Sequence, residues 1–218
     1  MGSHPDEWNC GVGQGGHTGK HPIEPDSRFM LVISLILASC LAAMGMRLPD
    51  LRPIGDGRNW MLVEPLVYRI DFSVNTVIVP RGFVTDFAGI PQAFQSLIQP
   101  DSPLFLPAIV HDFLYWDQGC TRRQSDSLFL LALTEMEVPR PARNEIYFAV
   151  RAFGQRAWDA NARDRAAGLP RFVPDSGVRA PQPREAWSEY RVYLQRAGSA
   201  SRPGNTVPPS ACSRGGPA

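Results

Sequence analysis

This 218-residue chain has almost no excess of charge of either sign. Its 22 Lys and Arg residues nearly balance its 21 Asp and Glu residues, which leaves a formal net charge of +1 at pH 7. A protein that binds nucleic acid through a general electrostatic field needs a basic surplus. The composition therefore excludes that class and predicts no nucleic-acid partner.

Cysteines are few and lie far apart along the chain. The four residues share no C-x-x-C spacing and are Cys10, Cys40, Cys120 and Cys212. This pattern predicts neither a zinc knuckle nor an evident disulfide framework. The sequence also contains no P-loop, no G-x-S-x-G motif and no Rossmann glycine pattern, so the enzyme classes that depend on these motifs are excluded.

Histidine is scarcer still in the part of the chain that we expect to fold. His4, His17 and His21 fall in the Gly-, His- and Pro-rich residues 1–28, and only His111 lies further on. Zinc hydrolases and HD-type phosphohydrolases bring two or more histidines to one metal, so these classes are excluded. A metal in this protein would be held mainly by oxygen ligands, which favours calcium or magnesium.

Residues 29–46 form an uncharged, apolar run that is close to the shortest length able to span a bilayer. Within it, "LASC" (37–40) resembles the lipobox of bacterial lipoproteins, in which the cysteine thiol receives a diacylglycerol group. We therefore expect lipidation at Cys40, a membrane or lipid partner, and a location in the cell envelope. Two alternatives are an uncleaved membrane anchor and a buried core helix. The Pro- and Gly-rich tether that follows, at residues 47–59, speaks against the core helix.

We expect the folded part to begin near Trp60 and to have an α+β fold. Residues 60–70 and 74–80 are rich in β-branched and aromatic side chains and flank a polar turn, which predicts a small antiparallel β-hairpin. A cluster of about three α-helices follows, because apolar residues recur at helical spacing. These helices are expected near 107–116, from Thr121 toward Pro139, and over 142–163. Thr121 and Gln124 form a capping-box pattern at the start of the second helix.

The two ends of the chain differ from this core in composition. Residues 60–161 form the expected core domain, and residues 162–197 a loop with a short amphipathic helix. Residues 1–28 and 198–218 contain few large apolar groups, so they bury too little surface to offset the entropy of ordering. We predict that both termini are disordered.

A histidine and an aspartate stand side by side in the apolar stretch "PAIVHDFLYW" (107–116). On the next helix, Asp126 shares a face with apolar residues three, four and seven positions later, and an inward carboxylate is costly unless it is paired. If the two helices are adjacent, Asp126 can reach one ring nitrogen of His111 and fix its tautomer. The other nitrogen could then take a proton from water. The alternative is that Asp126 pairs with an arginine such as Arg151, and that His111 only fills the core.

Two further acidic residues are candidate metal ligands. Asp112 lies about 100° round the helix from His111, so it can face the same cleft and offer both oxygens to a cation. Asp86 is in the loop "VTDFAGIP", and backbone carbonyls of a loop containing Gly82 and Gly89 could add calcium ligands. The alternative for Asp86 is the ordinary capping of a turn.

Four ordered motifs carry a resemblance to a known family. They are "P-x-G-F-x-T-D-F-A-x-I-P", "HDFLYW", "R-x-x-D-x-x-F" and "IYFAVRAFG". With these motifs, residues 60–160 resemble an uncharacterised family of phage and bacterial proteins, domain of unknown function 1353. The resemblance implies a shared fold and a phage-related lineage, and it brings no established activity.

A looser similarity is to the secreted phospholipases A2, which carry an H-D-x-x-Y helix. His111, Asp112, Tyr115 and Asp126 match that family's pattern, and "AVRAFG" (149–154) matches the end of its next helix. The resemblance implies that the histidine is the general base for water, that the aspartate after it binds calcium, and that the aspartate on the second helix orients the histidine. The chain departs from the family in lacking its glycine-rich calcium loop and the disulfides between its helices.

These observations lead to two hypotheses of different kinds. The first is a membrane-tethered, phospholipase-A2-like lipid ester hydrolase that uses His111 and Asp126, with calcium as its expected cofactor. The second is a non-catalytic, prophage-derived or cell-envelope lipoprotein with a structural or interaction role. A catalytic site requires the two side chains within hydrogen-bond reach beside an open apolar groove.

Overall fold

Short runs of β-branched and aromatic residues build two small antiparallel sheets. The computed structural model describes residues 49–87, 98, 102–199 and 207–215. A three-stranded sheet has the order β1-β2-β5, and a two-stranded sheet pairs β3 with β4. The strands are β1 (Leu51–Pro53), β2 (Trp60–Leu62), β3 (Leu66–Arg69), β4 (Thr76–Val79) and β5 (Val84–Thr85). The predicted hairpin is found in β3 and β4, whereas the predicted first strand is divided and its beginning pairs with β1 and β5.

The prediction of a tether at residues 47–59 is wrong for the residues from 49 onward. β1 pairs with β2 in the register Leu51 to Leu62, and a tight turn joins the two strands. In this turn, the Asp56 carboxylate accepts hydrogen bonds from the backbone amides of Arg58 and Asn59, at 2.9 and 3.0 Å. Gly55 and Gly57, which suggested a flexible tether, therefore belong to an ordered turn, and Pro53 is the last residue of β1.

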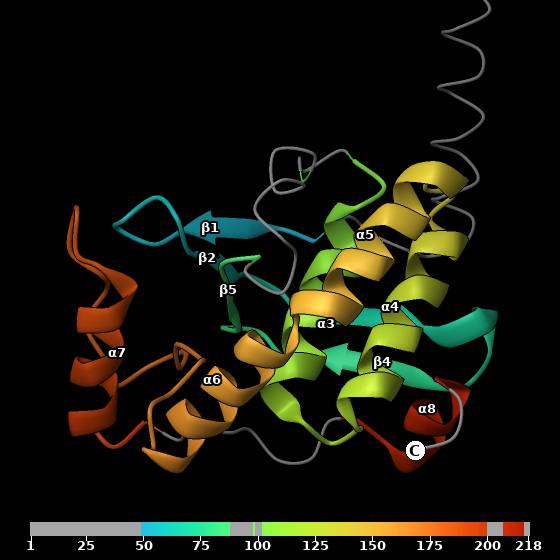
Figure 1. Cartoon of the computed structure of the whole chain (residues 1–218). Helices are drawn as coiled ribbons and strands as arrows, with labels where there is room; N and C mark the ends of the chain where they lie inside the picture. Colours follow the sequence, from blue (N-terminus) through green and yellow to red (C-terminus); the bar gives the residue numbers. More distant parts are fainter. Residues whose placement is uncertain (1–48, 88–97, 99–101, 200–206, 216–218) are drawn as a thin grey trace, which may run out of the picture. The chain divides into compact units, whose positions relative to one another are not determined.

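Four helices follow the sheets and include the predicted cluster. They are α3 (Phe105–Asp117), α4 (Arg122–Glu135), α5 (Arg140–Phe153) and α6 (Gln155–Ala166). α3 packs against α4 and α6, and α4 packs against α5 (Figure 1). Every residue of α3 is buried. The predicted capping box of α4 is confirmed, with the Thr121 hydroxyl accepting from the Gln124 amide and the Gln124 side chain accepting from the Thr121 amide.

The helix predicted over 142–163 is divided at Gly154 into α5 and α6. A Cβ atom at Gly154 would collide with the Tyr115 hydroxyl of α3, so only glycine fits this close approach. The division lets α5 pack on α4 while α6 packs on α3. The prediction of one continuous helix is wrong. The close approach of Tyr115 in α3 to residue 154 is a contact between helices, which the helical spacing of apolar residues does not indicate.

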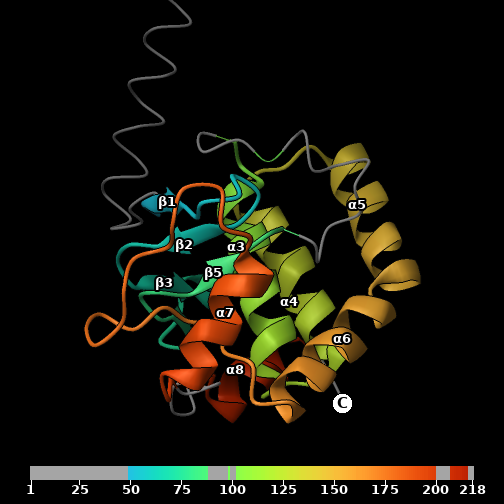
Figure 2. The same cartoon turned by 90° about the vertical axis from the view of Figure 1, so that its left-hand side faces the viewer.

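Two helices lie beyond α6. α7 (Trp187–Arg196) corresponds to the predicted short amphipathic helix. Its buried Tyr190 and Leu194 form a second apolar cluster with Ile54 and with Val84 of β5. Figure 2 shows the molecule from the side on which α7 lies. The last helix is α8 (Pro209–Arg214), which packs against α4. None of the helices in the described ranges combines the length and the apolarity that a bilayer span requires.

The prediction of a disordered tail over 198–218 is wrong for residues 207–215. Val207 and Ala211 are buried in the main core, and Cys212 forms a disulfide with Cys120 at a sequence separation of 92 residues. The disulfide also corrects the expectation drawn from the cysteine spacing. The covalent link and the buried apolar contacts offset the conformational entropy that this segment loses on ordering. Its polar composition alone would not offset that loss.

The α+β fold class is confirmed, and α3 lies at the centre of its main core. The largest buried side chains there are aromatic, among them Tyr68, Phe83, Phe113, Trp116 and Phe129. This core places His111 and Asp112 of α3 between α4 and the sheets. The predicted anchor at 29–46, with Cys40, lies outside the described residues.

Candidate active site around His111

The structure brings the predicted His111 and Asp126 side chains together. α3 and α4 are joined by a short turn and pack against each other. His111 Nε2 lies 3.1 Å from Asp126 Oδ1, and both side chains are fully buried. This distance is within hydrogen-bond range, so the two residues form the pair that the sequence indicated.

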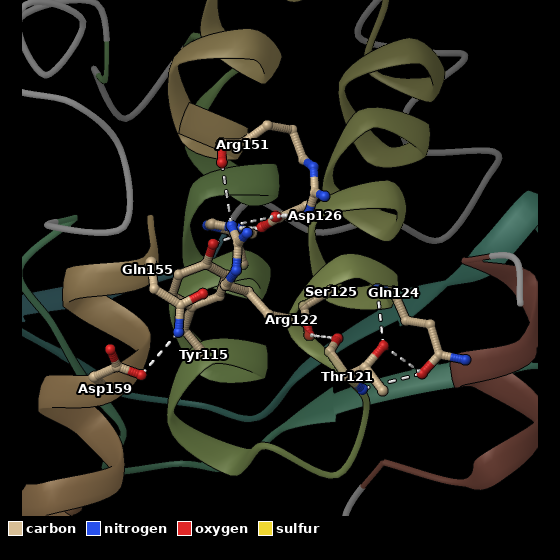
Figure 3. A network of polar contacts seen from close by, with 10 residues as sticks. Tyr115, Thr121, Arg122, Gln124, Ser125, Asp126, Arg151, Gln155 and Asp159 are labelled. Atoms are coloured by element: carbon tan, nitrogen blue, oxygen red, sulfur yellow. Dashed lines mark hydrogen bonds and ion pairs between the residues drawn. The ribbon is translucent and has the colours of Figure 1, made fainter. Parts of the chain in front are cut away.

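Asp126 has three further partners. The Tyr115 hydroxyl donates to Oδ1 at 2.6 Å. The guanidinium groups of Arg122 and Arg151 donate to Oδ2 at 3.1 and 2.6 Å (Figure 3). Pairing with the histidine and pairing with an arginine, which the sequence left as alternatives, therefore occur together.

These contacts keep Asp126 ionised. Burial by itself would raise the pKa of the Asp126 carboxyl, but the hydrogen bonds from His111, Tyr115 and Arg151 outweigh burial and place that pKa below its usual value. The negative charge of Asp126 in turn adds to burial in raising the pKa of Tyr115. Tyr115 therefore stays protonated and acts as a hydrogen-bond donor.

The other ring nitrogen of His111, Nδ1, is buried and has no hydrogen-bond partner among the described residues. Since the ionised Asp126 can only accept, Nε2 carries the proton in the neutral imidazole and Nδ1 keeps its lone pair. The ring is held by Tyr115 and Phe129, whose ring centroids lie 4.1 and 4.5 Å from it. The arrangement presents an oriented, uncommitted basic nitrogen in an apolar environment.

Asp112 and Asp86, the predicted metal ligands, lie near enough to each other for their charges to interact. The Thr85 hydroxyl donates to Asp112 Oδ2 at 2.5 Å, and Arg171 pairs with Asp86 at 2.8 Å. Burial is the main cause that raises the pKa of Asp112, and the negative charge of Asp86 is the second. The two carboxylates are close enough to influence each other, as the metal hypothesis requires.

The described residues do not fit a calcium ion by themselves. Calcium takes six to eight oxygen ligands, and no group of three or more His, Cys, Asp or Glu residues in the described ranges is placed to share a metal. The guanidinium of Arg171 already faces Asp86, and the Gly82 carbonyl accepts a hydrogen bond from the Val173 amide. The carbonyls around Gly89 lie outside the described residues, so calcium stays a prediction.

Arg122 and Arg171 are site residues that sequence reasoning missed. Arg171 is nearly buried, and its Nε donates to the Val84 carbonyl of β5 at 2.7 Å. It comes from the loop after α6, where no periodicity indicates a direction for the side chain. The one available signal was its position beside the apolar residues "FV" (172–173), which suggested burial of the flanking chain.

Access to His111 differs from the expectation of an open groove. His111 is fully buried, and the surface pocket of about 510 Å³ that Asp86 lines does not include it. Residues 88–97 and 99–101, which continue the chain from β5 toward α3, lie outside the described residues. The hydrogen-bond criterion for a catalytic pair is met in this structure, and the criterion of an open groove is not.

Comparison with known proteins gives one match. No curated protein and no solved structure matches this chain. Residues 60–150 match the family model described as "Protein of unknown function (DUF1353)", and this range contains the loop motif, "HDFLYW" and Asp126. Nothing in the comparisons bears on the looser similarity to secreted phospholipases A2, which stays a prediction. Over residues 60–150, which include His111 and Asp126, the chain is therefore similar to the DUF1353 family of proteins of unknown function.

Proposed function

We propose that this protein hydrolyses ester bonds in lipids, with His111 as the general base and Asp126 as the residue that orients it. The observation that carries the proposal is the unequal state of the two imidazole nitrogens. Nε2 is engaged by the ionised Asp126, whereas Nδ1 has no partner in the described part of the chain. A general base needs a fixed ring and a free lone pair, and this arrangement supplies both.

In the proposed reaction, Nδ1 takes a proton from a water molecule while the water oxygen attacks the ester carbonyl carbon. The resulting tetrahedral intermediate collapses as the bond to the alcohol oxygen breaks. The imidazolium returns its proton to that oxygen, which releases an alcohol and a fatty acid. Asp126 keeps its charge throughout and stabilises the imidazolium, because its own pKa is low.

Tyr115, Arg122 and Arg151 support this role through Asp126. Their hydrogen bonds occupy the carboxylate lone pairs that His111 does not use, so the carboxylate cannot rotate freely. An oriented carboxylate in turn holds the imidazole plane and its tautomer. We assign these three side chains a positioning role.

Two features support a location in the cell envelope. Disulfides persist in oxidising compartments and are rare in the cytosol, and Cys120 pairs with Cys212. The lipobox-like "LASC" would attach acyl chains at Cys40, which would hold the enzyme at the bilayer that contains its substrate.

A second candidate function is a non-catalytic envelope or prophage-derived protein. The complete burial of His111 between Tyr115 and Phe129 favours it, because a substrate must reach the base. In that case the Asp126 network would serve only to fix the packing of α3, α4 and α5.

A hydrolysis assay separates the two functions. The full chain is added to phospholipid vesicles with and without calcium, and released fatty acid is measured for the wild type, His111→Asn and Arg123→Gln. Arg123 is an exposed neighbour of Arg122 that takes no part in the network. We expect activity in the wild type and the control, and a loss of about a hundredfold or more in His111→Asn. Release no greater than from vesicles alone, or equal release by all three proteins, would favour the non-catalytic function.

A further inference from the structure

A surface pocket of about 510 Å³ lies between the β1–β2 turn and the beginning of α7. Residues of the turn, from Gly55 to Asn59, line one side, and residues from Arg184 to Ser188 line the other. The Trp187 backbone amide donates to Asp56 Oδ2 at 2.9 Å, which joins the two sides. The pocket is therefore formed by two ordered segments that are held together.

The acidic residues of the pocket are already engaged. Asp56 accepts hydrogen bonds from the amides of Arg58, Asn59 and Trp187 and from the Asn59 side chain. Asp86, at the edge of the pocket, is paired with Arg171. Arg171 therefore compensates the charge of Asp86, whereas the donors to Asp56 are neutral amides and leave its negative charge in the lining.

The two arginines that line the pocket, in contrast, have no partner for their guanidinium groups among the described residues. The guanidinium groups of Arg58 and Arg184 form no hydrogen bond or ion pair with any described residue. Both side chains are exposed at the pocket, so they can move toward a ligand at little cost. The pocket thus offers two positive charges with several N–H donors each, against the single negative charge of Asp56.

Two buried polar atoms in the lining also lack partners. Trp187 is 5% exposed, and its indole Nε1–H has no acceptor among the described residues. The Asn59 Oδ1 atom is buried and has no donor. Unsatisfied buried polar groups are costly, so a ligand with both an acceptor and a donor would be favoured at this place.

The position at the start of a ten-residue helix adds to this preference. Ala186, Trp187 and Ser188 are at the N-terminal end of α7, where Asp56 already accepts from the Trp187 amide and the Ala186 carbonyl accepts from the amides of Glu189 and Tyr190. The N-terminus of a helix carries partial positive charge and favours anions. An oxyanion that also bears a hydroxyl group would complement both arginines, the Trp187 indole and the Asn59 Oδ1 atom.

We propose that this pocket binds a phosphate group, either as inorganic phosphate or a soluble phosphate ester, or as the phosphate headgroup of a lipid. A singly protonated phosphate has acceptor oxygens for the arginines and for Trp187, and a hydroxyl for Asn59 Oδ1. The site makes no use of His111 and does not depend on the proposed hydrolase activity.

Binding to the full chain tests the proposal. Inorganic phosphate is titrated by calorimetry into the wild type, Arg58→Gln/Arg184→Gln, Trp187→Phe and Arg140→Gln. Arg140 is an exposed arginine on α5, outside the pocket, and serves as the matched control. We expect saturable binding that is about tenfold weaker or more in the double variant and measurably weaker in Trp187→Phe, because charge-assisted hydrogen bonds and one donor are lost. Arg140→Gln should bind as the wild type does.

A second titration, with dihexanoyl phosphatidic acid below its micelle concentration, identifies the source of the phosphate. Tighter binding than that of inorganic phosphate, lost in the double variant, would assign a lipid headgroup. Equal or weaker binding would assign soluble phosphate. The proposal is overturned if phosphate does not bind saturably, or if the double variant and the control bind equally. Circular dichroism checks folding, and if the double variant unfolds, the single Arg58→Gln variant gives the same comparison.

Discussion

At the scale of single residues, Asp126 is the side chain on which the candidate site depends. It is a fully buried carboxylate that accepts hydrogen bonds from an imidazole, a phenol and two guanidinium groups. Each donor comes from a different position on α3, α4 or α5. The loss of this carboxylate would leave several buried donors without an acceptor and two positive charges without a partner.

The variant Asp126→Asn should be destabilised by about 3–5 kcal/mol at pH 7, the range for breaking a buried ion pair. Its pH dependence should change as well. Because the folded-state pKa of Asp126 lies below its unfolded value, its stabilisation is present above the unfolded pKa and is lost as pH falls through the folded pKa. Urea denaturation at neutral and acidic pH measures both effects. Equal stability of wild type and variant at pH 7 would show that the network contributes nothing.

Asp112 should behave in the opposite way. Burial and Asp86 raise its pKa, so its ionised form is disfavoured in the folded state, and its contribution to stability improves as pH falls through the folded-state pKa. Asp112→Asn mimics the neutral carboxyl and keeps an acceptor for the Thr85 hydroxyl, so we expect it to be at least as stable as the wild type at pH 7. Asp112→Ala removes the acceptor and should cost about 1–3 kcal/mol. If Asn and Ala destabilise equally in urea, the ionised form of Asp112 is the one that the fold requires.

At the scale of the elements, the parts that the sequence predicted are those with local causes. The capping box of α4 was predicted because Thr121 and Gln124 are three residues apart and interact with each other. The division at Gly154 was not predicted. A side chain there would overlap the Val150 carbonyl oxygen and the hydroxyl of Tyr115, and Tyr115 lies 39 residues earlier in the chain. The docking of α8 depends on its disulfide with Cys120, which lies 92 residues before Cys212 in the chain.

The contact between Gly154 and Tyr115 predicts an unusual result. Alanine normally favours a helix over glycine, yet Gly154→Ala should destabilise the protein by about 1–3 kcal/mol, because its methyl group would overlap the Tyr115 hydroxyl. Tyr115→Phe removes that hydroxyl. The double variant should therefore lose less stability than the sum of the two single variants, a coupling that denaturation of all four proteins measures. Strict additivity would show that the two residues do not meet.

At the scale of the whole molecule, the disulfide connects the end of the chain to the turn between α3 and α4. Cys120 begins the segment that leads into α4, and Cys212 lies in α8, where Ala211 is buried beside it. Arg214 of α8 also pairs with Asp71, in the turn between β3 and β4.

The candidate site was predictable only in part. The spacing of the motifs indicated that His111 and Asp126 meet. The positions of Arg122 and Arg171 in the site depend on tertiary packing, which no local sequence pattern indicates.

Removal of the disulfide should therefore destabilise the protein. Cys212→Ser is expected to lower the free energy of unfolding by about 2–5 kcal/mol, the usual range for loss of a native disulfide. Cys10→Ser, which leaves this disulfide intact, is the control and should unfold as the wild type does. Thermal unfolding with and without a reductant measures the effect, and the reductant should bring the wild type to the level of Cys212→Ser. An unchanged Cys212→Ser would mean that the docking of α8 adds no stability.

The proposed role of His111 requires a lone pair on Nδ1 while Nε2 donates its proton to Asp126. Nitrogen-15 NMR of the imidazole, with the His111 signals assigned by their absence in His111→Gln, measures the protonation of each nitrogen directly. Because Nε2 faces Asp126 and Nδ1 has no partner among the described residues, we predict a proton on Nε2 and a lone pair on Nδ1. A ring that carries its proton on Nδ1, and so cannot donate to Asp126 or take a proton from water at that atom, would contradict the account.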